Sequence, residues 1–346
     1  MIYKQRSFPA IDVAKVVMAV AVVIIHKPLF LQDYPNYLLS NVLCDVAVPF
    51  FFAAASFLFF RKLGRETERP VTVWLRYEKR LLVLYLLYTI IYLPCIFVKN
   101  HTGYYSEITI GSIFGESLLL IKKFFWTASF AHLWYMNTLI LSIAILFGLS
   151  RIVKNKWVIL GIGTAAFAAI TLLWFFMYGQ VAPKGIMPIV YSVMKRGLLC
   201  CCLGYFAAQT DDTVPKWEKA LCPVLWIAIL ICGIMSYGRE SLFWENARLL
   251  LTFLCAYGTL RVCIGSNLQP RPVYGILRRY STLVYFLHLL LMSEGWAFLC
   301  RHVGIQDPGA HPFLYFCVTL FLAVAEATII LRLQKKERFD FLKYLY

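Results

Sequence analysis

Three ionisable side chains in the first long apolar stretch, residues 8–29, are candidates for chemistry: Asp12, Lys15 and His26. An α-helix advances about 100° per residue, so Lys15 and His26 fall on one face, with Asp12 within about 40° of it. Roughly 16 Å of helix axis separates Lys15 from His26. An imidazole titrates near neutral pH, which makes His26 a candidate general base. Asp12 and Lys15 are then expected to orient this face or to hold an anionic substrate.

The depth of these groups in the apolar stretch gives two interpretations. Ionisable groups within a membrane cost several kcal/mol unless they face a helix bundle or a wet cavity, which favours a functional face. Ala19 and Val22 complete that face. The alternative is an Asp12–Lys15 pair, one helical turn apart, near the cytoplasmic interface, with His26 at the outer interface. The spacing alone leaves both open.

A basic pair, Arg76 and Arg80, stands just before a later apolar run. Residues four apart share a helix face. Two guanidinium groups so placed suit the phosphates of a nucleotide-bearing donor such as coenzyme A. The alternative is ordinary anchoring by cytoplasmic cations next to a span.

Aromatic residues accompany a histidine at the start of another apolar run, in His132, Trp134 and Tyr135. Such rings suit stacking against a sugar or contact with a lipid headgroup, and they equally suit the aromatic belt found at membrane interfaces.

Two adjacent cations, Lys195 and Arg196, lie within an apolar run. At least one of them should face the protein interior and meet an acid or an anionic ligand, because two cations facing lipid would be costly. Arg196 is the preferred candidate for substrate binding.

Ser281, Tyr285 and His288 follow one another at spacings of four and three residues, which places all three on one helix face. Their hydroxyls and imidazole could bind and polarise a substrate. The alternative is hydrogen bonding between helices.

The elements that must position these residues follow from composition. The 346 residues are 61% hydrophobic and 15% charged, with a mean hydropathy of +0.70, whereas soluble domains are about half apolar and a quarter charged. We therefore expect an all-α polytopic membrane protein, residues 1–346 forming one domain. The eleven cysteines lie mostly in apolar runs and predict no metal site. The expected spans are 8–29, 41–60, 80–98, 130–149, 157–177, 187–208, 221–237, 245–264, 280–300 and 313–332.

The basic residues distribute unevenly between the two sides of these spans. Of the 34 Lys and Arg, 23 fall on the side of the N-terminus and seven on the other. Cytoplasmic loops are enriched in Lys and Arg, so both termini are expected in the cytoplasm. This distribution explains most of the net charge of +16 without a nucleic-acid partner. The apolar segment 108–121 is expected to form an interfacial or re-entrant helix.

Taken in order, these motifs resemble the acyltransferase-3 family of integral membrane O-acyltransferases over nearly the whole chain. The resemblance rests on Ile11-Asp12, the basic-x10-His arrangement of Lys15 and His26, Val48-Pro49-Phe50-Phe51-Phe52, Arg80-Leu81, His132 to Tyr135, and Ser281 to His288. The chain departs from the family in having Lys15 where Arg is frequent, and Ala55-Ser56 where the family has Ser-Gly. It is also similar to the membrane domain of vancomycin-resistance serine racemases, which is associated with amino-acid transport.

The resemblance implies a ten-helix bundle in the bacterial inner membrane that transfers an acyl group, often acetyl, from acyl-coenzyme A to a cell-envelope carbohydrate. His26 would be the base or, as an alternative, a transient acyl carrier. Arg80 would hold donor phosphates, and residues 132–135 would meet the acceptor. Acyl-coenzyme A is then a co-substrate, with no bound cofactor, and membrane lipid is a further partner. The alternative function is a transporter or flippase of a small polar solute.

Overall fold

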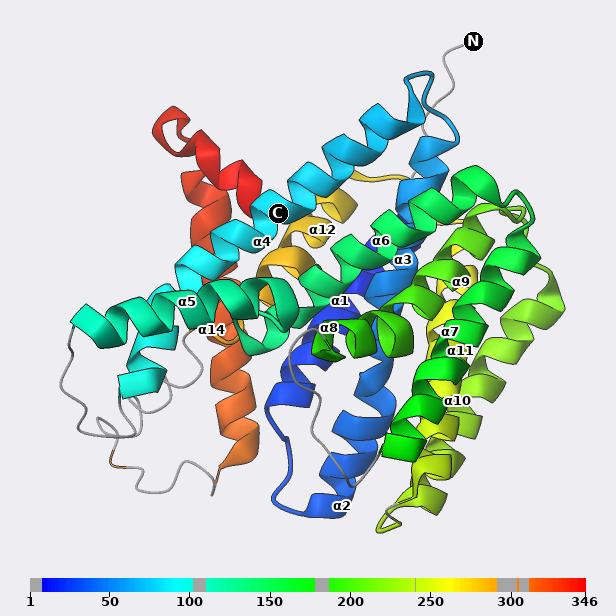
Figure 1. Cartoon of the computed structure of the whole chain (residues 1–346), viewed down its shortest axis with the longest axis horizontal. Helices are drawn as coiled ribbons and strands as arrows, with labels where there is room; N and C mark the ends of the chain where they lie inside the picture. Colours follow the sequence, from blue (N-terminus) through cyan, green and yellow to red (C-terminus); the bar gives the residue numbers. More distant parts are fainter. Residues whose placement is uncertain (1–7, 102–109, 178–186, 240, 291–303, 305–310) are drawn as a thin grey trace. The chain divides into compact units, whose positions relative to one another are not determined.

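The computed structural model describes residues 8–101, 110–177, 187–239, 241–290, 304 and 311–346. These residues form helices and turns, and no strand occurs among them. The all-α prediction is confirmed (Figure 1).

The helices vary in length and in their hydrogen-bonding pattern. The α-helices are α1 (Pro9–His26), α2 (Asp33–Asn36), α3 (Ala47–Leu63), α4 (Pro70–His101), α5 (Ile110–Trp126), α6 (Trp134–Ile152), α7 (Lys156–Met177), α8 (Met187–Ser192), α9 (Leu198–Ala208), α10 (Lys216–Ser236), α11 (Leu242–Ile264), α12 (Pro272–Leu287) and α14 (Pro312–Leu333). Two π-helical segments, η1 (Tyr37–Leu43) and η4 (Val193–Gly197), and three 3-10 segments, η2 (Cys44–Val46), η3 (Ala131–Leu133) and η6 (Glu337–Leu345), connect or extend them.

Eight helical segments among the described residues are long and apolar enough to cross a membrane. They correspond to eight of the expected spans. Of the other two, 80–98 lies within α4, and 280–300 begins in α12 and continues beyond the described residues. The count of ten therefore stays a prediction. A helix, α5, covers most of the segment 108–121, and its interfacial position also stays a prediction.

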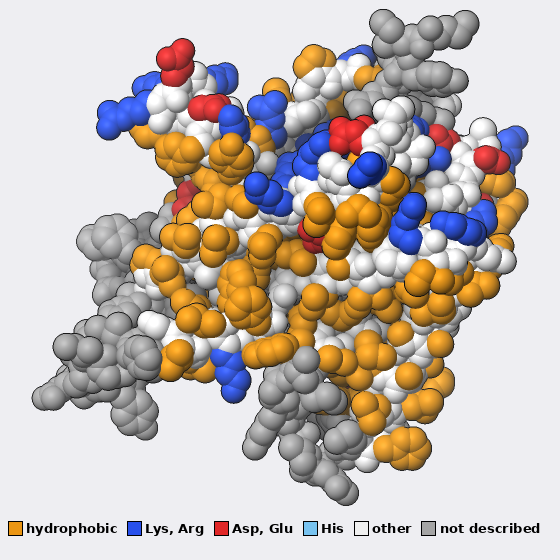
Figure 2. Space-filling view, turned by 45° about the horizontal axis from the view of Figure 1, so that its top comes forward, with side chains coloured by type: hydrophobic (Ala, Val, Ile, Leu, Met, Phe, Trp, Pro, Cys, Tyr) orange, Lys and Arg blue, Asp and Glu red, His pale blue; other side chains and the backbone are white. Residues whose placement is uncertain are grey.

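Large hydrophobic side chains lie on the protein surface, as expected for helices that face lipid. Phe176, Phe243 and Phe321 are each more than two-thirds exposed. Hydrophobic side chains also cover much of the face drawn in Figure 2. In water such a surface would cause aggregation or bind a partner, but in a bilayer it is the surface that contacts the lipid chains.

The described helices form two compact units. The first unit, residues 1–57, 207–344 and 346, contains α1, α2, α10, α11, α12 and α14. The second unit, residues 58–206 and 345, contains α4 to α8. The chain passes between the units within α3 and within α9. Whether residues 1–346 act as one domain stays a prediction.

In the first unit, α1 packs against α12 and also contacts α14. Small and β-branched side chains allow this close approach, and Ala19, Val23, Val284 and Ala323 form a buried cluster there. Small residues at helix interfaces are the usual means by which membrane helices associate. Helices α10 and α11 lie side by side in the same unit (Figure 1).

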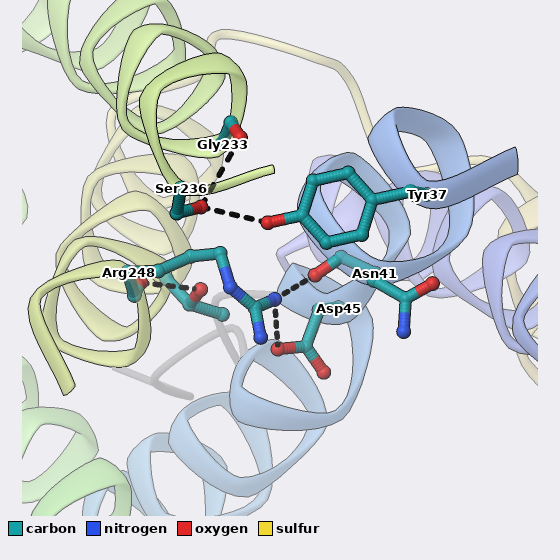
Figure 3. A network of polar contacts seen from close by, with 7 residues as sticks. Tyr37, Asn41, Asp45, Gly233, Ser236 and Arg248 are labelled. Atoms are coloured by element: carbon teal, nitrogen blue, oxygen red, sulfur yellow. Dashed lines mark hydrogen bonds and ion pairs between the residues drawn. The ribbon is translucent and has the colours of Figure 1, made fainter. Parts of the chain in front are cut away.

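A polar brace connects α11 to the irregular segment η1–η2 (Figure 3). The Arg248 guanidinium donates to the backbone carbonyl of Asn41, and its Nη1 lies 3.6 Å from Asp45 Oδ2. Next to it, Tyr37 and Ser236 share a hydrogen bond of 2.7 Å between their hydroxyls. A π-helical turn lacks the regular α-helical hydrogen bonds between residues four apart. In η1, the carbonyl oxygen of Asn41 accepts a hydrogen bond from Arg248 instead.

In the second unit, the π-helical segment η4 packs against α6 and α7. Gly197 allows this contact, because a Cβ at this position would collide with the side chains of Thr138 and Ser142. Thr138 also shares a 2.7 Å hydroxyl–hydroxyl hydrogen bond with Ser192. The irregular helix is therefore held by close packing and by a buried polar contact.

Candidate functional site

One end of the α1–α12 contact is an ion pair with a forked geometry. Arg278 Nε donates to Asp12 Oδ1 and Nη2 donates to Asp12 Oδ2, both at 2.8 Å. The Asp12 side chain is 5% exposed, whereas that of Arg278 is 57% exposed. Parallel donors of one guanidinium match the two oxygens of a carboxylate, so this pair fixes orientation as well as charge.

The other end of the same contact holds two histidines. The rings of His26 and His288 have their centroids 5.2 Å apart, at an interplanar angle of 37°. His288 is buried and His26 is half-buried. Since Asp12 meets Arg278 at one end and His26 meets His288 at the other, α1 and α12 run in the same direction. The sequence did not reveal that its two histidine motifs meet.

The face of α1 between these ends is buried as the spacing predicts. Asp12, Ala19 and Val22 are all at most 3% exposed. Lys15 is half-buried. The predicted stripe from Asp12 to His26 therefore faces the interior of the first unit over most of its length, and the carboxylate of Asp12 is bound by α12.

The three residues expected on one face of α12 are all buried. The Ser281 hydroxyl donates to the Arg278 carbonyl at 2.8 Å. The Tyr285 ring packs against Phe51 of α3 with a centroid distance of 5.6 Å. His288 Nδ1 lies 2.7 Å from the Tyr285 carbonyl, and a carbonyl only accepts, so this nitrogen carries the proton.

In the second unit, the basic pair on α4 is exposed. Arg76 binds Glu68 through Nη2 at 2.7 Å and Nη1 at 3.4 Å. Arg80, one turn further on, is exposed too. Surface ion pairs of this type are worth little to stability, at about 0–1 kcal/mol, so Arg76 can exchange Glu68 for another anion at small cost.

The His132 segment is packed more deeply than its expected interfacial position suggests. His132 is 1% exposed and lies between the rings of Tyr92, at 4.8 Å, and Phe130, at 5.8 Å. Tyr135 is buried and Trp134 is half-buried. Of the three, Trp134 is the most accessible to a ligand.

The adjacent cations of η4 separate as expected, with one buried and the other exposed. Lys195 is 2% exposed, with its Nζ 5.1 Å from the centre of the Tyr191 ring. Arg196 is exposed, with its guanidinium 5.6 Å from the centre of the Trp134 ring. The interior cation is therefore Lys195, whereas Arg196, the preferred candidate for substrate binding, lies at the surface. Arg196 and Trp134 form a cation–π pair within the second unit.

Comparisons with known proteins identify the family of the chain. The sequence model of a family described as an acyltransferase domain matches residues 8–332. The chain belongs to the acyltransferase-3 family. Together with the eight candidate membrane spans among the described residues, this membership identifies a multi-pass membrane protein. The matched region includes every site residue predicted from the sequence.

Two curated relatives share less than a third of their aligned residues with the chain. The chain is 29% identical to a serine/alanine racemase of Enterococcus gallinarum over 336 residues, covering 93% of this chain and 46% of the relative. It is 26% identical to an amino-acid racemase of Enterococcus faecalis over 146 residues, covering 41% of this chain and 18% of the relative. The chain thus spans less than half the length of either relative. No solved structure matches it.

Proposed function

We propose that this acyltransferase moves an acyl group, such as acetyl, from acyl-coenzyme A to a hydroxyl of a cell-envelope carbohydrate, with His26 as general base. The observation that carries the proposal is the state of His26. Its ring contacts His288, but neither of its ring nitrogens has a hydrogen-bond partner among the described residues. A half-buried imidazole with an open nitrogen is suited to accept a proton from a bound hydroxyl.

The proposed reaction is a direct transfer. The acceptor hydroxyl oxygen attacks the thioester carbon while its proton moves to the unprotonated ring nitrogen of His26. A carbon–oxygen bond forms and the carbon–sulfur bond breaks. The coenzyme A thiolate then takes the proton from the His26 imidazolium, and the base is restored. General-base catalysis of this kind contributes about 10²–10⁴-fold to the rate.

Different side chains are assigned to the two substrates. Arg80 and Arg76 are proposed to bind the donor phosphates, since both are exposed cations on one face of α4. The acceptor is proposed to meet Trp134, Tyr135 and Arg196, together with His132 of the same segment. Aromatic and guanidinium planes suit sugar rings, which present an apolar face and a hydroxyl edge. The half-buried Lys15 is proposed to stabilise charge beside the His26 stripe.

The experiment that tests the proposal measures coenzyme A release and acyl incorporation in membranes supplied with acetyl-coenzyme A. His26→Ala and His26→Gln are each expected to lose about 10²–10⁴-fold of the activity, because glutamine keeps hydrogen bonds but cannot accept a proton. His311→Gln is the control, since His311 is an exposed histidine of the same unit. Full acylation by His26→Gln would exclude His26 as the base.

The proposed location is the bacterial inner membrane with both termini in the cytoplasm, supported by the uneven distribution of Lys and Arg. Reporter fusions after Tyr346 test it directly. A cytoplasmic reporter such as green fluorescent protein is expected to be active there, and alkaline phosphatase inactive. The opposite result would reverse the topology and place the donor on the wrong side.

A second candidate is transport of a small polar solute, and the names of the two racemase relatives favour an amino acid as that solute. Proteoliposomes with labelled serine and no acyl-coenzyme A distinguish the two. Uptake by wild-type protein that shows no coenzyme A release would support transport and exclude the acyltransfer mechanism proposed above.

A further inference from the structure

We propose that His288 is a positioning residue for His26: its Nε2 accepts the ring N–H of His26, which leaves the other nitrogen of His26 unprotonated toward the acceptor hydroxyl. The inference rests on the proposed role of His26 as a base. It assigns His288 a role other than direct substrate binding, and it makes the two histidine motifs one catalytic unit.

The first step concerns the tautomer of His288. Its Nδ1 lies 2.7 Å from the Tyr285 carbonyl and 3.2 Å from the Val284 carbonyl. Both partners can only accept, so Nδ1 must donate. In the neutral ring the proton is therefore on Nδ1, and Nε2 carries a lone pair. The end of α12 thus presents an acceptor nitrogen, set by two backbone groups.

His26 is oriented by few neighbouring groups among the described residues. A catalytic histidine is usually held by a third group, most often a carboxylate, which selects its tautomer and ring direction. No carboxylate forms an ion pair or hydrogen bond with His26 among the described residues, whereas the His288 ring contacts it directly. The adjacent Lys27 is turned to Tyr315 of α14, whose hydroxyl it binds and whose ring centre lies 3.7 Å from its Nζ.

The imidazole rings of His26 and His288 contact each other, with centroids 5.2 Å apart and planes tilted by 37°. Catalytic hydrogen bonds are often long in the free enzyme and tighten when substrate binds. A hydrogen bond between the two rings requires a rotation of the half-buried His26 about its side-chain torsions. His288 stays in place, because it is hydrogen-bonded to the backbone and only 2% exposed.

This arrangement forms a chain of donors and acceptors: the Tyr285 carbonyl, the Nδ1–H and Nε2 of His288, the N–H of His26, and then its open nitrogen. Two imidazolium ions in contact would repel each other. The pair therefore holds one excess proton at most, the one taken from the acceptor. That proton returns to the departing thiolate, so the chain is restored after each turnover.

Two isosteres of histidine separate positioning from plain structural support. The amide of glutamine reaches about as far as Nε2, so His288→Gln keeps an acceptor for His26 but loses the bond to the Tyr285 carbonyl. The amide of asparagine reaches about as far as Nδ1, so His288→Asn keeps the hydrogen bond to the backbone but has no acceptor within reach of His26. We expect His288→Asn to lower kcat by about 10-fold to 10²-fold with an unchanged KM for acetyl-coenzyme A, and His288→Gln to retain most of the activity.

A measurement that does not depend on turnover accompanies these variants. With ¹⁵N-labelled histidine and coenzyme A present, wild-type protein is expected to give a through-hydrogen-bond ¹⁵N–¹⁵N coupling between two imidazoles. His26→Gln and His288→Gln should each remove it, and His311→Gln should not. If the coupling is missing in wild-type protein, or if His288→Asn is as active as wild type, His288 does not position His26.

Failure of the two proposals can be distinguished. Wild-type protein without coenzyme A release overturns the proposed function. Wild-type protein that is active, is inactivated by His26→Gln and is unaffected by His288→Asn overturns only the role of His288. A result in which His288→Gln is inactive and His288→Asn is active assigns His288 to backbone support, and likewise overturns its role toward His26.

Discussion

Arg278 binds both carboxylate oxygens of Asp12, although 266 positions separate the two residues in the chain. This pair closes one end of the α1–α12 contact, and His26 with His288 closes the other. Since helix α1 is held at both ends by the same partner, the orientation of the His26 stripe depends on α12 as a whole. The stability of this contact is therefore a condition for the proposed chemistry.

Removing the arginine from this pair should be more harmful than removing both charges. Arg278→Ala leaves the buried carboxylate of Asp12 without its two guanidinium hydrogen bonds. We expect the free energy of unfolding to fall by about 1–3 kcal/mol. The double variant Asp12→Asn, Arg278→Ala should recover part of that loss. Thermal unfolding in detergent with a thiol-reactive dye measures it, because Cys200, Cys201 and Cys202 are buried until the protein unfolds. Equal losses in the single and double variants would contradict a charge-based explanation.

The basic pair on α4 should affect the donor and not the chemical step. Arg80→Ala is expected to raise the KM for acetyl-coenzyme A about tenfold with little change in kcat, since one charge-assisted hydrogen bond is worth about 1.5–3 kcal/mol. Arg80→Lys should be intermediate, because lysine keeps the charge but not the fork. Lys79→Ala is the matched control, an exposed cation one position away on another face. Steady-state kinetics at fixed acceptor concentration decides between these outcomes, and identical KM values for all variants would limit Arg80 to a topological role.

The sequence predicted local features well. Composition and apolar runs indicated an all-α membrane protein, and the spacing of Asp12, Ala19 and Val22 predicted a buried face of α1. These features depend on helix periodicity, which is a property of neighbouring residues. The same periodicity placed Ser281, Tyr285 and His288 on one buried face of α12.

The pairings between distant helices were beyond the sequence. Arg278 counted only as one more cytoplasmic cation, and nothing in its surroundings indicated Asp12 as its partner. Lys195 is the buried one of two adjacent cations, and the π-helical turn at 193–197 changes the angle between successive side chains there. Two adjacent cations in one span predict that at least one of them is buried. The local helix geometry decides which one it is.

The close contact between Gly233 and Val42 is another pairing of distant segments that the sequence did not predict, and it can be tested by substitution. A Cβ added to Gly233 of α10 would lie 2.6 Å from Val42 Cγ2, in the π-helical segment η1. Gly233→Ala is expected to destabilise the protein by about 1–3 kcal/mol, the usual cost of overpacking. Gly275→Ala is the control, since a Cβ there would meet nothing within 4 Å. Combining Gly233→Ala with Val42→Ala should relieve the collision, and a double variant no more stable than Gly233→Ala would show that steric overlap is not the cause.

A carboxyl in the first half of α4 gives a pH-dependent prediction. Glu78 precedes the expected span 80–98, and burial raises its pKa to about 7, against the opposing effect of a 3.0 Å hydrogen bond from Trp74 Nε1. Its Oε2 is buried without a hydrogen-bond partner among the described residues. An ionised Glu78 would therefore hold a charge with one oxygen poorly solvated.

The sign of the effect follows from proton binding. The folded protein binds this proton more tightly than the unfolded chain, in which a glutamate has a pKa of about 4.3. Protonated Glu78 therefore contributes stability below about pH 4.3, and this contribution falls as the pH rises to about 7. Glu78→Gln is neutral at every pH, so it should unfold at a higher temperature than wild type at pH 8, and this difference should become much smaller at pH 5. Glu68→Gln, a change at the exposed partner of Arg76, should show no such trend. A difference between Glu78→Gln and wild type that stays constant from pH 5 to pH 8 would mean that Glu78 does not titrate in this range.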